Sequence, residues 1–316
     1  MALIEVSVAA IVEEGQGNRA LRLEPVAGEL PAFEAGAHVD LHLPGGLVRQ
    51  YSIASAPHVR DHYLLCVRHA ADSRGGSRHV CEQLAGGQRL WISEPRNLFP
   101  LQSGGPQLLL AAGIGITPLL SMAQALDARG EAFVLHYYVR SMAQAAFLSQ
   151  LRTGFAHGRV ELHASEAGQS PRTHVPEELL QASHGHLYLC GPVAFMDRYA
   201  ALAAAAGWPA AQVHREHFGV LDSALPGDGA FEVELASSGQ VVTVPADASI
   251  ASVLLAAGIP VDLSCEQGMC GACLTGVLAG EPDHRDCVLS DGERAANDQI
   301  TVCCSRSRSP RLVLDL

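Results

Sequence analysis

The sequence predicts a multidomain fold with three parts in chain order: an antiparallel β-barrel, an α/β domain built on a parallel sheet, and a small α+β domain. Three observations support this fold class. Short segments of alternating polarity fill the first hundred positions, apolar strands alternate with helical patterns over the next hundred, and a hairpin and a helix precede a group of cysteines near the C-terminus. A chain of 316 residues has room for about two or three domains.

Residues 1–102 are expected to form the barrel. The segments ALIEVSVAAIV, HVDLHLP and HYLLCVRH alternate in polarity and are separated by glycine and proline, which is typical of antiparallel strands. Another segment of this region contains RQYSI, in which Arg49 can contact a phosphate, Tyr51 can lie against a flat cofactor, and Ser52 can approach its reactive atom. Taken alone, this stretch is explained equally well as a half-buried strand.

A second stretch of the barrel region, Arg74-Gly75-Gly76-Ser77, leads into the helical pattern SRHVCEQLAGG. Two glycines and a serine at the start of a helix present free amide groups and the positive end of the helix dipole. Such a place stabilises an anion, so the sequence predicts a phosphate site here.

Residues 103–222 are expected to form the α/β domain, because the strands PQLLLAAG and AFVLHYYV alternate with helical patterns. The turn after the first strand reads AGIGITP. Its Gly113 and Gly115 allow a pyrophosphate to approach the backbone at the start of the helix, and Pro118 suits the first helical turn. A glycine turn between strand and helix also occurs in sheets that bind no ligand.

Cys190-Gly191-Pro192 follows the strand HLYL in the same region. It therefore lies at the carboxyl edge of the predicted sheet, where open parallel sheets bind their ligands. No neighbouring base is visible in the sequence, so Cys190 is expected to be a small, polarizable contact rather than a nucleophile. An ordinary turn at the end of a strand is the alternative.

Residues 230–316 are expected to form the α+β domain, after a linker at 219–230 that is rich in glycine, proline and small residues. The pattern FEVELASSGQVVTV predicts a hairpin, and SIASVLLAAG predicts a helix that stops at Gly258. Hairpin, helix and a cysteine-bearing loop together predict a small sheet that grips a helix, the β-grasp arrangement of ferredoxins.

The cysteines predict an iron-sulfur site. Cys265, Cys270 and Cys273 stand in the run CEQGMCGAC, and Cys303 follows after twenty-nine residues. This spacing is typical of a plant-type [2Fe-2S] cluster, in which each iron takes two thiolates. A structural zinc site is disfavoured because only one tight C-x2-C pair is present. Cys304 is an alternative fourth ligand, although the spacing favours Cys303.

Composition narrows the classes of function. The formal net charge is −12, and all twenty-one basic residues are arginine, which excludes Schiff-base chemistry and lysine-dependent phosphate loops. The acidic balance argues against a nucleic-acid partner. With no signal pattern and no apolar stretch long enough to cross a membrane, the chain is expected to be cytoplasmic, and its nine cysteines are expected to be thiols or metal ligands.

The order of these motifs resembles that of the phthalate dioxygenase reductase family, which includes the reductases of vanillate and related O-demethylases. The resemblance covers essentially the whole chain. It rests on RQYS, RGGS, PRNLFPL at 95–101, AAGIGITPLLSMA, CGP, HREHFG at 214–219 and the C-terminal cysteine pattern, in that order. It implies a flavin-binding barrel, an NAD-binding sheet of the ferredoxin-reductase type and a fused C-terminal ferredoxin.

The resemblance also implies roles for the barrel residues. Arg49 is expected at the phosphate or ribityl part of the flavin, Tyr51 along the ring, and Ser52 near the nitrogen that accepts the hydride. The phosphate site, which holds FMN rather than FAD in these reductases, matches Gly75, Gly76 and Ser77.

For the α/β domain, the resemblance places Thr117 where flavin and nicotinamide meet, and Cys190 with Gly191 and Pro192 beside the nicotinamide. The HREHFG segment supplies Glu216 and Phe218 near the flavin. The family usually has a small or polar residue where this chain has His217, so the role of Glu216 stays open.

Arg140 follows the strand AFVLHYYV, near the expected adenosine ribose. A lone arginine there can meet the 2′-phosphate of NADPH, but without a second basic residue it forms a poor phosphate site, which favours NADH.

The implied activity is that of an NADH-dependent oxidoreductase. It is the reductase component of an aromatic-ring oxygenase or O-demethylase, and it passes electrons from NADH through FMN and a [2Fe-2S] cluster to a terminal Rieske-type oxygenase. Two alternatives remain. One is an electron donor to a haem-thiolate monooxygenase, and the other is a free-standing NADH-dependent flavin oxidase, which would not need the C-terminal cluster.

Overall fold

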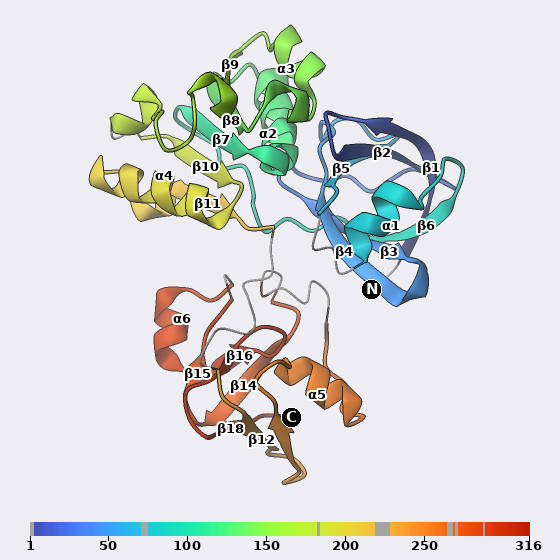
Figure 1. The fold of residues 1–316 in the computed structure, drawn as a ribbon, viewed down its shortest axis with the longest axis vertical. Helices are drawn as coiled ribbons and strands as arrows, with labels where there is room; N and C mark the ends of the chain where they lie inside the picture. The colour runs from blue at the N-terminus through green and yellow to red at the C-terminus, as the bar shows by residue number, and fades with distance from the viewer. Residues whose placement is uncertain are drawn as a thin grey trace. The chain divides into compact units, whose positions relative to one another are not determined.

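A computed structural model describes residues 3–70, 75–181, 184–218, 228–263, 268, 271–286 and 288–316 (Figure 1). Contacts between residues divide the chain into two compact units, Met1–Phe218 and Gly219–Leu316. Three residues named above lie outside the described residues: Arg74, Cys265 and Cys270.

The first half of the first unit is a six-stranded antiparallel sheet with the order β4-β3-β6-β1-β2-β5. An isolated bridge between Ile53 and Leu65 links the end of β4 to β5, so the sheet nearly closes on itself. The strands are β1 (Leu3–Glu13), β2 (Asn18–Pro25), β3 (His38–Leu43), β4 (Leu47–Ser52), β5 (Tyr63–Arg68) and β6 (Arg89–Ser93), and helix α1 spans Gly76–Glu82. The predicted antiparallel barrel is confirmed.

The second half of the first unit is a five-stranded parallel sheet with the order β11-β10-β7-β8-β9. Apolar residues of β7 alternate between its two faces: Leu109 packs with α2 and α3, and Leu110 packs with α4. The elements are β7 (Gln107–Ala112), α2 (Ile116–Arg129), β8 (Phe133–Val139), α3 (Leu148–Thr153), β9 (Gly158–Ala164), β10 (His186–Cys190), α4 (Val193–Ala205) and β11 (Val213–Glu216). The predicted α/β domain is confirmed.

The second unit is a mixed five-stranded sheet with the order β13-β12-β18-β14-β16. Ile250 and Leu254 of α5 are fully buried in its core, so the sheet grips this helix as predicted. The side chain of Ser249 caps α5 by accepting a hydrogen bond from the Ser252 amide. The elements are β12 (Phe231–Leu235), β13 (Val241–Val244), α5 (Ile250–Ala256), β14 (Leu274–Ala279), β15 (Pro282–Asp283), α6 (Asp291–Ala296), β16 (Gln299–Thr301), β17 (Arg306–Ser307) and β18 (Arg311–Leu314).

Short 3-10 helices complete the described chain, at Pro44–Gly46, Gly113–Gly115, Met142–Gln144, Ser165–Ala167, Glu177–Leu180 and Ala210–Gln212. Among the helices of the described ranges, none is both long enough and apolar enough to cross a membrane.

A largely buried ion-pair network ties the start of the second unit to its sheet. The Arg285 guanidinium donates to both carboxylate oxygens of Asp228, at 2.7 and 2.6 Å, and to Asp283 at 2.7 Å. Buried Arg306 donates to the carbonyls of Ala248 and Gly229 at 2.7 and 3.1 Å. Residues 228–230, which the sequence assigns to the linker, therefore pack with the second unit.

Candidate active site

Three polar side chains from distant parts of the first unit meet at the ends of three strands. Ser52 ends β4, Cys190 ends β10 and Glu216 ends β11. The Ser52 hydroxyl donates a hydrogen bond to Glu216 Oε2 at 3.4 Å, and the Cys190 thiol lies 3.9 Å from the same oxygen. The Ser52–Cys190–Glu216 group therefore joins the barrel to the carboxyl edge of the parallel sheet.

Burial keeps this group uncharged. It raises the pKa of Glu216 to about 8, although hydrogen bonds from Ser52 and Cys190 lower this pKa in part. Burial also raises the pKa of the Cys190 thiol well above its usual value, and the neighbouring Glu216 adds to the effect. Near neutral pH, Glu216 is mostly a carboxylic acid and Cys190 is a thiol, which is a poor nucleophile.

The glycine turn after β7 packs against the same edge. A Cβ atom on Gly115 would lie 2.2 Å from the Cys190 carbonyl oxygen, so only glycine fits between α2 and the end of β10. Gly113 has a φ of +57°, and a Cβ there would lie 3.5 Å from a guanidinium nitrogen of Arg68. Thr117 is buried in the first turn of α2, where its hydroxyl donates to the Ile114 carbonyl at 3.1 Å.

The other expected coenzyme residues line the carboxyl edge of the parallel sheet. Half-buried Gly191 and exposed Pro192 connect β10 to α4. Arg140 directly follows β8 and is exposed, and Phe218, two residues beyond β11, is 38% exposed. These residues come from three of the strands at the edge where open parallel sheets bind their ligands.

The two phosphate motifs of the barrel are in contact with each other. A Cβ atom on Gly76 would lie 2.5 Å from Arg49 Cγ and 2.8 Å from its Nε, so the start of α1 accommodates the Arg49 side chain only because residue 76 is glycine. Gly75 has a φ of +96°, a conformation that favours glycine. The Ser77 hydroxyl accepts a hydrogen bond from the Ala70 amide at 3.3 Å.

Tyr51 lies beside this pair on β4. Burial raises the pKa of its hydroxyl, and the nearby Arg49 guanidinium lowers it in part. One strand therefore presents a guanidinium, an aromatic ring and the Ser52 hydroxyl in sequence, which suits an elongated ligand with an anionic end and a flat ring.

In the second unit, Cys273 and Cys303 are buried at the same end of the β14–β16 pair. The Val302 amide donates to the Cys273 carbonyl at 3.3 Å, which holds the two segments together. Gly268 and Gly271 of the ligand loop have φ angles of +68° and +71°. Two buried thiols beside a glycine-rich loop fit a [2Fe-2S] cluster. The ligands expected at 265 and 270 lie outside the described residues.

Cys304 is fully buried and packs against the backbone of the same loop. A Cβ atom on Gly268 would lie 2.4 Å from Cys304 Sγ. This sulfur also lies 3.2 Å from the Thr301 hydroxyl. Cys304 is thus buried next to Cys303 and near the ligand loop, and the choice of Cys303 as the fourth ligand stays a prediction.

Two residues near the coenzyme edge were not identified from the sequence. Glu166 follows β9, and its carboxylate accepts a hydrogen bond from the Met142 amide at 3.1 Å, while its own amide donates to the Arg140 carbonyl at 3.1 Å. Arg68 ends β5 beside the glycine turn. The arginine near the end of the segment HYLLCVRH is a signal in the sequence that could have identified Arg68. Glu166 had no such signal, because no strand was predicted before it.

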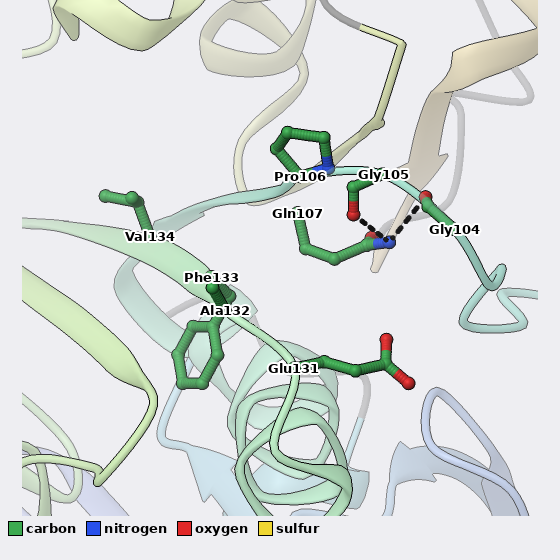
Figure 2. Close-up of a pocket in the computed structure, with 8 residues that line it drawn as sticks. All are labelled: Gly104, Gly105, Pro106, Gln107, Glu131, Ala132, Phe133 and Val134. Atoms are coloured by element: carbon green, nitrogen blue, oxygen red, sulfur yellow. Dashed lines mark hydrogen bonds between the residues drawn. The ribbon is translucent and has the colours of Figure 1, made fainter.

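A pocket of about 610 Å³ lies at another edge of the parallel sheet. Figure 2 shows the residues that line it. The pocket lies at the N-terminal ends of β7 and β8 and is lined by Gln107, Glu131 and Phe133, among others. The Gln107 side-chain amide donates to the carbonyls of Gly104 and Gly105 at 3.2 and 3.4 Å. Because Cys190 and Glu216 end their strands at the opposite edge, this pocket is separate from the Ser52–Cys190–Glu216 group.

Comparison with known proteins identifies both the second unit and the whole chain. Residues 233–308 match the family model described as a 2Fe-2S iron-sulfur cluster binding domain. The vanillate O-demethylase oxidoreductase of Pseudomonas sp. (strain HR199) is 48% identical over 99% of this chain and 100% of its own length. The structure of phthalate dioxygenase reductase superposes with a TM-score of 0.78 and 35% identity, covering 100% of this chain and 98% of the other.

The chain belongs to the phthalate dioxygenase reductase family. It is an oxidoreductase with a [2Fe-2S] domain, and its succession of barrel, parallel sheet and ferredoxin-type domain is the one predicted from the sequence. The structure of a type IV self-sufficient cytochrome P450 monooxygenase also contains a region similar to this chain. That structure covers 99% of this chain with 34% identity and a TM-score of 0.78, and the match spans 41% of the P450 chain.

Proposed function

We propose that this chain is the reductase component of a multicomponent aromatic-ring oxygenase or O-demethylase. Electrons pass from NADH through FMN and the [2Fe-2S] cluster to a terminal Rieske-type oxygenase. The observation that carries the proposal is the Ser52–Cys190–Glu216 group, because it joins a barrel with a phosphate site to the coenzyme edge of a parallel sheet. The [2Fe-2S] domain on the same chain supplies the outlet for the electrons.

The barrel residues position the flavin. When bound, FMN accepts two electrons together and releases them one at a time, which is the chemistry needed between NADH and a one-electron cluster. Arg49 and the amides of residues 75–77 hold the phosphate, and Tyr51 lies along the ring. Their mutual contacts in the structure support this assignment.

The Ser52–Cys190–Glu216 group prepares the place where the two rings meet. Hydride transfer needs the reacting atoms roughly 3 to 3.5 Å apart, so the main task of the protein is orientation and exclusion of water. A protonated Glu216 adds no negative charge where a hydride arrives, and it keeps Ser52 in a fixed hydrogen bond. Thr117 closes the site from the α2 side, and Phe218 covers it beyond β11.

The coenzyme is NADH rather than NADPH. Gly113 and Gly115 admit the pyrophosphate, and Gly191 with Pro192 borders the nicotinamide. At the ribose end, the Glu166 carboxylate lies beside the loop that starts at Arg140, which disfavours a 2′-phosphate. We expect Arg140→Ala to change the ratio of kcat/KM for NADH over NADPH by less than about threefold, because a 2′-phosphate contact would contribute about 1.5 to 3 kcal/mol. Steady-state rates with both coenzymes test this.

A haem-thiolate monooxygenase is the second candidate acceptor. The observation in its favour is the P450 structure, in which a region similar to this chain forms part of a monooxygenase polypeptide. The Rieske acceptor is preferred because the relative that covers nearly the whole chain at 48% identity is named for an O-demethylase.

The proposed assignment of domains is 1–102 for FMN, 103–222 for NADH and 230–316 for the cluster, with ligands Cys265, Cys270, Cys273 and Cys303. The cytoplasm is the proposed compartment, since reduced thiols are normal there.

Anaerobic chemistry of the pure protein tests the proposal. We expect iron, acid-labile sulfide and FMN in a ratio of about 2:2:1, bleaching of both chromophores by NADH, and NADH-dependent turnover of a Rieske-type O-demethylase in a reconstituted mixture. Stoichiometric zinc without sulfide contradicts the cluster. Turnover of a haem-thiolate monooxygenase without turnover of any Rieske oxygenase selects the second candidate.

A further inference from the structure

The barrel and the parallel sheet make contact at a place that is not part of the Ser52–Cys190–Glu216 group. The turn between β1 and β2 holds the loop that follows β8, residues 142–147. The bonds are Gln16 N–H to Ala143 O at 2.7 Å, Asn18 Nδ2 to Gln144 O at 3.0 Å, and Phe147 N–H to Glu14 Oε2 at 3.0 Å. We call Glu14, Gly15, Gln16 and Asn18 the turn clamp.

Only glycine fits at position 15 of the turn clamp. Its φ is +72°, and a Cβ atom on it would lie 2.6 Å from the Ala145 carbonyl oxygen. A side chain at this position would push the turn and the loop apart. Gly17 lies in the same turn with a nearly equal φ of +78°, but a Cβ atom on it would meet nothing within 4 Å.

The loop held by the clamp is fixed from the sheet side as well. The Met142 amide donates to Glu166 at 3.1 Å, and the Ala146 amide donates to the hydroxyl of fully buried Tyr137 at 3.1 Å. Phe147 has a φ of +56°, a conformation that costs free energy for a bulky residue and persists only where neighbours impose it. The loop is therefore a rigid connection between the sheet and the barrel.

A separate seam joins the same two halves along α2. The Ser121 hydroxyl donates to the Ser55 carbonyl at 2.8 Å, and the Gln124 amide donates to the Ala54 carbonyl at 2.8 Å. These two seams lie apart from the Ser52–Glu216 hydrogen bond, which also joins the barrel to the sheet. Several separated contacts resist rotation of one half on the other better than any one of them alone.

We propose that the turn clamp is a positioning device for hydride transfer, which sets the angle of the nicotinamide-binding sheet on the flavin-binding barrel. The inference rests on the proposed function. The clamp residues are not among those assigned above to the flavin or the coenzyme, although Asn18 pairs with Arg68, which lies beside the glycine turn. We therefore expect them to act through the orientation of the two halves and not through affinity. A displacement of about 1 Å at the reacting atoms reduces a rate by about a hundredfold.

Gly15→Ala tests the proposal, with Gly17→Ala as its matched control. Both variants place a side chain at a positive φ in the same turn, but only the first collides with the loop. The rate constant of flavin reduction is measured anaerobically against NADH concentration in the complete FMN- and cluster-loaded protein. We expect the saturating rate of Gly15→Ala to fall by about 10- to 100-fold, with the Kd for NADH changed less than about threefold. Gly17→Ala is expected within about threefold of wild type on both quantities.

Asn18→Asp is the second variant, because it keeps the shape of the side chain and replaces the donor to Gln144 by a carboxylate. It is expected to lower the saturating rate in the same way, and it decides the question if Gly15→Ala loses its FMN or unfolds. Saturating rates of both variants within about threefold of Gly17→Ala overturn the proposal, and so does a loss of NADH affinity alone. If the wild type itself is not reduced by NADH, the proposed function fails first, and the clamp then has no hydride transfer to position.

Discussion

Glu216 is an acid that its neighbours keep neutral. It is 26 residues from Cys190 and 164 residues from Ser52, so its surroundings cannot be predicted from the run HREHFG, and its role stays open at the level of sequence. Burial among these partners raises its pKa to about 8. The sequence identifies the residue types of the site. The raised pKa of Glu216, however, arises only when the ends of three strands meet in the folded protein.

Replacing Glu216 by glutamine removes this titration. The pKa is raised on folding, so between about pH 4.5 and pH 8 the folded state keeps a proton that the unfolded state releases, and stability falls as the pH rises through this window. We expect wild type to lose about 3 to 4 kcal/mol more stability than Glu216→Gln between pH 5 and pH 8. Thermal unfolding of both proteins across that range measures it, and parallel Tm profiles would argue against the raised pKa.

The neighbouring cysteines 303 and 304 have different expected effects. Cys303→Ser should abolish the absorbance and EPR signal of the [2Fe-2S] cluster, because serine is a harder and poorer ligand for iron. Cys304→Ser should retain the cluster, since Cys304 packs against Gly268 and Thr301 as a buried neighbour. Iron and sulfide content of the two purified variants provide the readout. The reverse pattern would identify Cys304 as the ligand.

At the scale of elements, a strand can be located from the sequence when its apolar residues form a continuous or alternating pattern. Strands with continuous or alternating apolar residues, such as those ending at Ala112 and Val139, were located from the sequence. Strand β9 was not located from the sequence, because its residues GRVELHA are mostly half-buried or exposed and form no apolar run. Glu166, which follows β9, was missed with it. Contacts between elements, such as Gly76 with Arg49, also depend on tertiary packing, and the two motifs were predicted separately.

The contact at the start of α1 predicts a specific loss of flavin affinity. An added Cβ on Gly76 collides with Arg49, so Gly76→Ala should displace the guanidinium from the phosphate. We expect the Kd for FMN to rise by about tenfold or more, which corresponds to the 1.5 to 3 kcal/mol of a hydrogen bond to a charged group. Gly86→Ala is the matched control, because a Cβ there meets nothing within 4 Å. Equal FMN affinity of the two variants would disprove the steric argument.

At the scale of the whole molecule, the cores follow the two units. The apolar clusters around Leu41, Leu109 and Leu110 consist of residues from the first unit, and the cluster around Leu312 consists of residues from the second. Each unit therefore buries its own apolar surface, which is the physical requirement for independent folding. The sequence predicted this separation through its linker and change of pattern, but not the turn clamp, whose partners are about 130 residues apart.

A chain that ends at Phe218 tests this separation and the direction of electron flow together. Because Ser52, Cys190, Glu216 and the phosphate motifs all belong to the first unit, the shortened protein should fold, bind FMN and be reduced by NADH within about threefold of the wild-type rate. Without the [2Fe-2S] domain it should reduce ferricyanide, a one-electron acceptor that can meet the flavin directly, yet support no turnover of the oxygenase. Oxygenase turnover by the shortened chain would show that electrons leave from the flavin and bypass the cluster. Failure to bind FMN would show that the second unit is required for the first to fold, and the independence inferred from the separate cores would then be wrong.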